Sequence, residues 1–253
     1  MSQPWEIYDA LLDGLPDDVV VRTAGQGPRW SRVLNSAGGV GTAWTMDVRS
    51  RPALGGDGPL DGRVLRDVGA LAKSWNLAEA SIGQAAINSW YSREQTAAAN
   101  GFEPTGEGLT WRQVFDPYQE MIAGKRVAVI GHFPFAEAAL AGAGEYICLE
   151  RNLQPGDWPD SACEYILPEC DVVFISSSSF VNKTAPRLIE LSRQAHTVLV
   201  GPSTPLNPVL LDYGVDTITG FVAARSLSDP VSLAEMVPAG DIGPGFRVHR
   251  HRA

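Results

Sequence analysis

The sequence predicts an α/β protein in which a small α+β lobe precedes a Rossmann-like, doubly wound parallel sheet. After residue 120, short apolar runs alternate with helical patterns, and the runs lack the strict alternation of strands that face water on one side. Before residue 95, three extended stretches lie close together and two helical patterns follow. A polar, Gly- and Pro-containing connection separates the two patterns. We therefore expect domains at 1–95 and 121–253, joined by 96–120.

The first lobe is predicted to have the order β-β-β-α-α. Its strands are expected at 19–23, 31–35 and 42–46, and AGQGPRW between the first two is a hairpin-type turn signal. Two helices follow, near 65–72 and 82–90, where apolar residues keep helical spacing. This order is that of an α+β lobe.

The second part is predicted to alternate strands and helices. Its strands are expected at 126–130, 146–150, 171–176, 196–201 and 216–222, and its helices at 135–143, 160–167 and 184–195. The final RVHRHRA is expected to be a solvated terminus. A doubly wound sheet binds its ligands at the carboxyl ends of its strands, so the residues that follow each strand are the candidates for function.

Composition excludes several classes of partner. The net charge of −9 argues against binding to a nucleic-acid backbone, which requires clustered Lys and Arg. No apolar run approaches the ~20 residues of a membrane helix, and the first residues lack the pattern of a secretion signal. The three cysteines form no CxxC pair and make a poor disulfide framework. We therefore expect a cytoplasmic protein with no membrane or nucleic-acid partner.

The stretch VIGHFPF follows the first strand of the second part. Phe133 and Phe135 stand where a dinucleotide-binding loop needs glycines, and Pro134 lacks an N–H donor, so NAD is not expected in its usual pose. Phe133 and Phe135 are instead counted among the candidate ligand-binding residues. His132 is placed at the strand end as an acid/base, a hydrogen-bond donor or a metal ligand. The alternative is a histidine under the loop whose ring is satisfied by the backbone.

Glu150 closes the next strand, 19 residues after Gly131. Rossmann folds bind a ribose hydroxyl pair with an acidic residue at about this spacing, and the same position suits another hydroxyl- or amine-bearing ligand. An exposed carboxylate without a ligand is the alternative. Asp157 is expected to cap or shape the loop that follows.

Polar residues also follow the third and fourth strands. The stretch SSSSFVNKT predicts a cradle of hydroxyl and N–H groups for a carboxylate or a single phosphate, whereas a Walker loop is absent. A plain helix cap with an exposed lysine is the alternative. The rigid GPSTP loop presents two more hydroxyls. The candidate ligand-binding residues here are Ser177, Ser178, Asn182, Thr184, Ser203 and Thr204, with Lys183 as an acid/base if the protein is an enzyme.

Two stretches of the first lobe complete the candidate ligand-binding residues. Glycines in NSAGGVGTAW predict an anion-binding nest, a close approach of the second lobe or a tight turn. Polar residues in SIGQAAINSW share one helix face among small residues, which indicates a lobe interface or the wall of a cleft. These residues are Gly38, Gly39, Gly41, Ser81, Gln84 and Asn88.

GGVG with SIGQAAIN, then VIGHFPF, PGDWPDSACEYILPECDVV, FVNKT and GPSTPLNP, together resemble one family, the bacterial and archaeal proteins called putative heavy-metal chelation proteins. The resemblance covers about residues 10–245. It implies an enolase-N-terminal-like domain before a Rossmann-like domain, a site between them that chelates a metal, and a homodimer. The sequence lacks the Cys and His spacing of a structural zinc site. A transition-metal ion would need His132 with Glu150, ligands from the first lobe, or a small molecule that already holds it.

Two functions remain open from the sequence, besides that of a ligand-free scaffold. The first is a binding protein that holds a metal ion or a metal–ligand complex in the interdomain cleft. The second is an enzyme that acts on a small polar metabolite with an adenosyl or amino-acid part. In that enzyme Glu150 would bind a hydroxyl pair or an amine, and His132 or Lys183 would supply acid/base chemistry.

Overall fold

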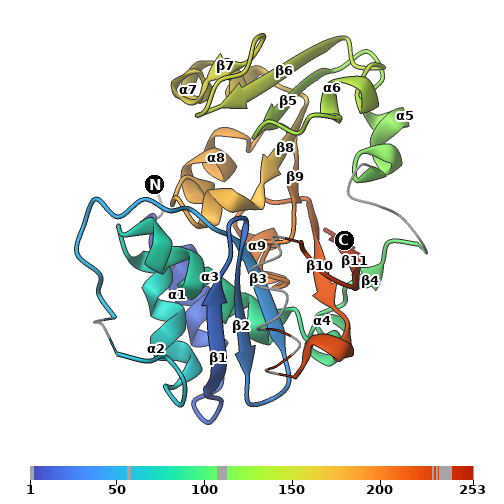
Figure 1. Cartoon of the computed structure of the whole chain (residues 1–253). Helices are drawn as coiled ribbons and strands as arrows, with labels where there is room; N and C mark the ends of the chain where they lie inside the picture. The colour runs from blue at the N-terminus through green and yellow to red at the C-terminus, as the bar shows by residue number, and fades with distance from the viewer. Residues whose placement is uncertain are drawn as a thin grey trace.

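Two β-sheets organise the chain, one of three strands and one of eight (Figure 1). The computed structural model describes residues 3–55, 58–106, 113–229, 231, 233 and 241–252. The small sheet is antiparallel with the order β1-β2-β3, and the large sheet has the order β4-β11-β10-β9-β8-β5-β6-β7. The predicted α/β class, with a small α+β part before a mostly parallel sheet, is confirmed.

The small sheet and the helices around it come from the first hundred residues. A helix, α1, precedes the sheet and was not predicted; its residues Tyr8 and Leu11 are fully buried. Helix α3 begins after Asn76, whose side chain accepts a hydrogen bond from the Glu79 N–H (3.3 Å), as an N-cap residue does. The elements are α1 (Glu6–Asp13), β1 (Val21–Gln26), β2 (Trp30–Asn35), β3 (Val40–Trp44), α2 (Leu65–Gly69), η1 (Ala70–Lys73), α3 (Leu77–Tyr91) and α4 (Glu94–Ala99).

The large sheet contains the five predicted parallel strands of the second part, with β4 and β11 added beyond β10 and β7 added beyond β6. The first of these five strands, β5, lies between β6 and β8. The chain continues from β5 to β6 on one side and then crosses back to β8 on the other side. Its strands are β4 (Glu103–Pro104), β5 (Arg126–Ile130), β6 (Glu145–Glu150), β7 (Trp158–Pro159), β8 (Val172–Ser176), β9 (His196–Val200), β10 (Thr217–Ala223) and β11 (Gly245–His251). The α-helices between them are α5 (Gln119–Ile122), α6 (Ala136–Ala139), α7 (Cys163–Ile166), α8 (Ala185–Leu191) and α9 (Val209–Asp212). Short 3-10 turns are η3 (Asp116–Tyr118), η4 (Asp160–Ala162), η5 (Leu167–Glu169), η6 (Ser177–Phe180) and η7 (Arg225–Leu227).

Both faces of the large sheet are covered, as the apolar runs predict. Along β5, Val127 and Val129 belong to one buried cluster, whereas Ala128 between them belongs to another. Along β8, Phe174 shares the first cluster and Val173 the second. Alternate residues therefore enter two separate cores, which explains why these strands show no polar face.

The expectation for the C-terminal tail was wrong. Residues 245–251 form β11, which pairs antiparallel with β10, and Val248 is buried. His249 and His251 each contact a threonine hydroxyl through Nδ1 at 3.0 Å, those of Thr105 and Thr217. Arg247, beside Val248, is also buried, so the basic composition of this segment does not keep it in solvent.

The two parts of the chain pack together through a polar seam. Asn88 on α3 donates through Nδ2 to the carbonyls of Thr42 (2.8 Å) and Ser203 (2.9 Å), and the Trp44 N–H donates to Ser203 Oγ (2.8 Å). Farther along, Tyr8 Oη donates to the Phe180 carbonyl (2.7 Å). The seam explains why α3 is buried on nearly every side although several of its residues are polar.

In the described part of the chain, none of the helices combines the length and the apolar character that crossing a membrane requires.

Candidate functional site

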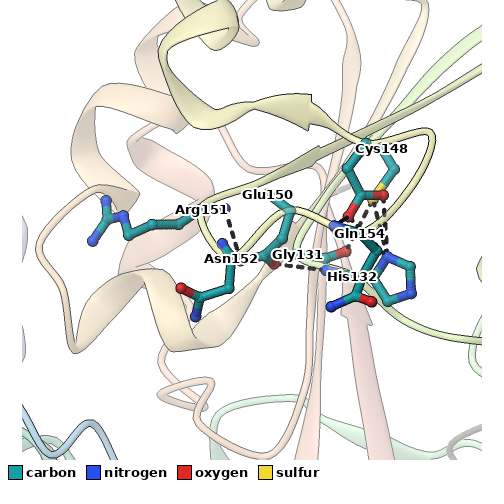
Figure 2. Close-up of polar contacts among 8 residues, drawn as sticks. Gly131, His132, Cys148, Glu150, Arg151, Asn152 and Gln154 are labelled. Carbon is teal, nitrogen blue, oxygen red and sulfur yellow. Dashed lines mark hydrogen bonds and ion pairs between the residues drawn. The ribbon is translucent and has the colours of Figure 1, made fainter.

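The ends of β5 and β6 bring together three side chains of the kinds that can ligate a metal. His132 Nδ1 lies 3.1 Å from both carboxylate oxygens of Asp157 and 4.0 Å from Cys148 Sγ. One ligand atom from each of the three residues lies within 4.8 Å of the others. Figure 2 shows the imidazole of His132 and the side chain of Cys148 together, whereas the Arg151 side chain extends away from them. We call these three residues the His–Cys–Asp cluster.

A tight turn positions Asp157 in the cluster. The Asp157 N–H donates to the Gln154 carbonyl (3.0 Å) across Pro155–Gly156, and Gly156 has φ +97°, as the third residue of a type II turn requires. The turn returns the chain to the edge of β6, where Trp158 pairs with Leu149 in parallel register. One residue earlier, this register sets Asp157 beside Cys148.

Glu150 supports the loops around the cluster. Its Oε2 accepts a hydrogen bond from the His132 N–H (2.8 Å), and its Oε1 accepts from the N–H groups of Arg151 (2.7 Å) and Asn152 (2.8 Å). Three backbone donors therefore share this carboxylate, which leaves little capacity for a ribose hydroxyl pair. The geometry makes Glu150 a residue that orients His132, whereas the sequence suggested that it holds a ligand or a metal.

Asp157 and Cys148 differ in how readily they lose a proton. Burial opposes ionisation of Asp157, whose side chain is only 4% exposed, but hydrogen bonds from the Gln154 N–H, Cys148 and His132 leave the pKa of its carboxyl below the ordinary value. Burial, with the adjacent Asp157 carboxylate, raises the pKa of the Cys148 thiol to about 12. Without a cation, the cluster thus holds a carboxylate and a neutral thiol.

The donor set fits a transition-metal ion. Imidazole nitrogen, thiolate sulfur and carboxylate oxygen bind Zn²⁺ at about 2.0–2.3 Å, which in a tetrahedral site separates neighbouring donor atoms by about 3.3–3.6 Å. The distances from His132 Nδ1 to the Asp157 carboxylate oxygens (3.1 Å) and to Cys148 Sγ (4.0 Å) lie on either side of this range. A divalent ion beside a thiol also favours the thiolate strongly, so the raised pKa of Cys148 does not prevent ligation. Three protein ligands would leave a coordination position for a water or another ligand.

The same residues do not form a nucleophilic relay. In such a relay the histidine uses one ring nitrogen toward the nucleophile and the other toward the carboxylate. Here Cys148 and Asp157 both approach Nδ1 of His132. A raised pKa of the thiol also opposes its use as a nucleophile, which needs the thiolate. Metal ligation therefore suits the cluster better than covalent catalysis.

The phenylalanines of HFPF have a packing role. Phe133 and Phe135 lie against Phe115, with ring centroids 5.8 and 6.0 Å away, and Phe115 in turn contacts Phe174 of β8 at 5.0 Å. The bulk that occupies the expected phosphate loop thus covers one face of the large sheet. Neither ring belongs to the His–Cys–Asp cluster.

The glycine-dense stretch serves close packing. A Cβ on Gly41 would lie 2.0 Å from the Ala85 carbonyl, and a Cβ on Gly39 would lie 2.0 Å from that of Ser89, so both glycines admit α3 against β3. Gly38 occupies the β2–β3 turn with φ +79°, and its carbonyl accepts from Ser228 Oγ (2.7 Å). Gly39 and Gly41 therefore allow the approach of a helix of their own lobe, whereas Gly38 forms a tight turn that contacts the second part of the chain.

The polar residues of α3 and of the GPSTP loop meet each other. Gln84 Nε2 donates to Asn88 Oδ1 (3.1 Å), and Asn88 and Ser203 form the seam described above. Ser81 Oγ donates to the Leu77 carbonyl (2.8 Å), and Thr204 Oγ1 donates to that of Gly201 (2.7 Å). Gln84 and Asn88 thus both contact the Ser203 carbonyl of the second part, whereas Ser81 hydrogen-bonds to Met46 and Leu77 of its own lobe. All of these side chains are buried.

The SSSSFVNKT stretch joins the two parts of the chain. Val181 packs in the core of the small-sheet lobe, and Asn182 Oδ1 accepts from both the N–H (3.1 Å) and Oγ1 (2.6 Å) of Thr184. Ser177 is buried, and Ser178 Oγ hydrogen-bonds Ser176 Oγ (3.0 Å). These polar groups are thus largely used within the protein.

Sequence reasoning missed two members of the cluster. Cys148 lies inside an apolar strand and was not assigned to a site, while Asp157 was assigned only to its loop. The sequence signal for Asp157 is PGD at 155–157. It predicts a type II turn a few residues after the strand at 146–150, and such a turn returns the aspartate toward that strand.

Comparisons with known proteins agree with the fold and with a metal-related role for the family. Residues 113–246 match a family model described as "Putative heavy-metal chelation", DUF364, and residues 8–91 match a second model with the same description, DUF4213. No curated protein matches the chain.

Two solved structures are similar over nearly the whole chain. A protein of unknown function from the DUF364 family of Desulfitobacterium hafniense DCB-2 is 37% identical with a TM-score of 0.85, and the match covers 98% of each chain. A DUF364 protein of unknown function from Pyrococcus horikoshii is 21% identical with a TM-score of 0.75, covering 98% of this chain and 99% of that one, and it supports the fold alone.

Proposed function

Because the chain belongs to the DUF364 family, whose description is "Putative heavy-metal chelation", we propose that it binds one divalent transition-metal ion through His132, Cys148 and Asp157. The observation that carries the proposal is the convergence of Nδ1, Sγ and a carboxylate oxygen within 4.8 Å. All three ligands follow or lie on neighbouring strands of the large sheet. The proposed centre therefore belongs to the Rossmann-like part of the chain and differs from the interdomain cleft, and from the His132–Glu150 pair, that we expected.

Mixed nitrogen, sulfur and oxygen ligands indicate the class of metal. Thiolate and imidazole suit Zn²⁺, Cd²⁺ and other late transition metals, whereas Mg²⁺ and Ca²⁺ prefer oxygen ligands alone. The His132 side chain is 35% exposed, which gives an ion or a small chelating molecule access from one side. The free coordination position supports binding of a metal–ligand complex as well as of a bare ion. The small-molecule partner in that case would bind through the metal.

The proposal requires a reduced Cys148. The cysteines are free and buried, and a cytoplasmic location, expected from their number and spacing, would keep the thiol available. The homodimer implied by the family resemblance remains a prediction, since none of the three ligands needs a second copy of the chain.

The enzyme alternative has less support. Its main candidate, Glu150, is engaged by three backbone N–H groups, and the polar residues at the other strand ends take part in the seam. We therefore place the function in metal binding.

Isothermal titration of the reduced protein with Zn²⁺ and Cd²⁺ tests the proposal. We expect one ion per chain with a dissociation constant below about 1 μM, or about −8.2 kcal/mol. His132→Ala should weaken binding by about tenfold or more, because even the loss of a hydrogen-bond partner of a metal ligand commonly costs about 10–100-fold. His196→Ala removes a histidine from outside the cluster and serves as the control. Affinity weaker than about 1 μM, or equal affinity in His132→Ala, would refute the proposal.

A further inference from the structure

A second feature, independent of the metal centre, is a cavity of about 310 Å³ at the seam between α1 and α8. Its lining includes Trp5, Tyr8, Trp75, Lys183, Arg187 and Glu190. None of these residues belongs to the His–Cys–Asp cluster. The volume lies in the range of sites for small molecules. We call it the Lys183 pocket.

Aromatic rings form the walls of the Lys183 pocket. Trp5 and Trp75 meet edge to face with centroids 5.9 Å apart, and Trp75 remains 57% exposed although it is a large apolar residue. Tyr8 uses its hydroxyl on the Phe180 carbonyl, so it presents only its ring. These walls suit a flat, apolar molecule, which would contact the rings by stacking or by their edges.

The backbone of Lys183 is held in an unusual conformation. Among the described residues, it is the only non-glycine with positive φ, +66°. The left-handed conformation costs an ordinary residue about 1–2 kcal/mol, and such strain tends to persist at functional positions. The Asn182 side chain fixes the turn by accepting both hydrogen bonds from Thr184. The fold thus directs a lysine, where glycine would fit better, into the pocket.

The amine of Lys183 has no carboxylate partner among the ion pairs of the described residues. Its Nζ donates to the Val181 carbonyl (2.8 Å) and lies 5.7 Å from the Trp75 ring centroid. Glu190 in the pocket wall pairs with Arg187 (2.8 Å), and Glu79 acts on Lys183 only through its charge. Burial lowers the pKa of Lys183 to about 8. A lysine in such surroundings is partly neutral near pH 7.5 and can act as a nucleophile.

We propose that Lys183 is a reactive amine and that its pocket presents small aromatic aldehydes or ketones to it for Schiff-base formation. The lone pair of Nζ attacks the carbonyl carbon, the C=O π electrons move to oxygen, and proton transfer gives a neutral carbinolamine. Loss of that oxygen as water leaves a C=N bond between ligand and lysine. A cationic ligand is disfavoured, because Lys183 and Lys73 already lie over the rings of Trp75 and Trp5.

Reductive trapping tests this proposal, since the chain has only three lysines, Lys73, Lys125 and Lys183. The full chain is incubated with benzaldehyde and cyanoborohydride, whose hydride reduces the C=N bond to a stable amine, and each lysine is quantified by peptide mass spectrometry. Near pH 7.5 we expect the adduct on Lys183 to form about tenfold faster than on either other lysine, because a group with a pKa of about 8 is roughly a quarter neutral there.

A pair of tryptophan variants separates pocket-directed capture from simple amine reactivity. Trp75→Ala should slow adduct formation on Lys183 by about fivefold, because it removes the exposed wall of the pocket. Trp158→Ala removes a similarly exposed tryptophan from β7 and should leave that rate unchanged. Circular dichroism establishes that both variants are folded. The proposal is overturned if Lys183 reacts no faster than the other two lysines, or if Trp75→Ala reacts like the parent.

Discussion

Cys148 Sγ lies 4.0 Å from His132 Nδ1, although Cys148 lies on β6 and His132 follows β5. The parallel pairing of β5 with β6 sets this distance, and the turn after β6 adds the carboxylate of Asp157. Each residue has an ordinary local reason for its place. Together they form a donor set that neither strand supplies alone.

Cys148→Ser should remove the thiolate from the bound metal. With Cd²⁺, the parent protein is expected to show an ultraviolet band from thiolate-to-metal charge transfer, and the variant should lack it and bind about tenfold or more weakly. Cys163→Ser is the matched control, because Cys163 is also free and buried but lies on α7. An unchanged band in Cys148→Ser would show that another group ligates the metal.

Asp157→Asn and Glu150→Gln should have different effects. Asp157→Asn is expected to lower the Zn²⁺ affinity by about tenfold, because a carboxylate ligand becomes a neutral amide. Glu150→Gln should change that affinity less but lower the free energy of unfolding by about 1.5–3 kcal/mol, since its carboxylate accepts three backbone hydrogen bonds. Titration and urea denaturation measure the two quantities. If Glu150→Gln instead weakened Zn²⁺ binding more than Asp157→Asn, the metal ligands would be His132 and Glu150, as the sequence suggested.

The sequence predicted the large sheet well because both of its faces are buried. The uninterrupted apolar runs of β5, β8 and β9 carry that information within a few residues. The tail strand β11 was missed because its partner, β10, is distant in sequence and its composition is basic. The position of His132 was predicted from the strand end alone. The place of Cys148 beside it depends on the register of β6 against β5, and that of Asp157 on the register of β7 against β6, neither of which a single sequence reveals.

Gly41→Ala should destabilise the fold strongly. The added Cβ would lie 2.0 Å from the Ala85 carbonyl and 2.1 Å from the Ser89 amide nitrogen, and these backbone atoms cannot rotate away. We expect a loss of about 3 kcal/mol in the free energy of unfolding, measured by urea denaturation. Gly142→Ala, where a Cβ meets nothing within 4 Å, should change it by less than about 0.5 kcal/mol. Similar values for the two variants would contradict the close packing of α3 on β3.

Asn88→Ala should weaken the seam between the two parts of the chain. It leaves the carbonyls of Thr42 and Ser203 without their shared donor, at a cost of about 1–3 kcal/mol for buried groups. Urea denaturation should show this loss, and hydrogen exchange should show faster exchange at the Trp44 N–H, which donates to Ser203. Asn152→Ala, at an exposed position, is the control. Parent-like exchange in Asn88→Ala would mean that the seam does not depend on this side chain.

The reaction of Lys183 with an aldehyde should depend on pH in a way that identifies its surroundings. Its adduct rate should rise through about pH 8 and then level off, because burial lowers the pKa of this amine, whereas an ordinary lysine gains neutral amine up to about pH 10.4. The charge of Glu79 favours the ammonium form, so Glu79→Gln should move the midpoint to lower pH. The exposed Glu120→Gln is the control, and trapping with mass spectrometry across the pH range measures all three proteins. A midpoint near the ordinary lysine value, or one that Glu79→Gln shifts upward, would mean that the pocket does not desolvate the amine as its walls indicate.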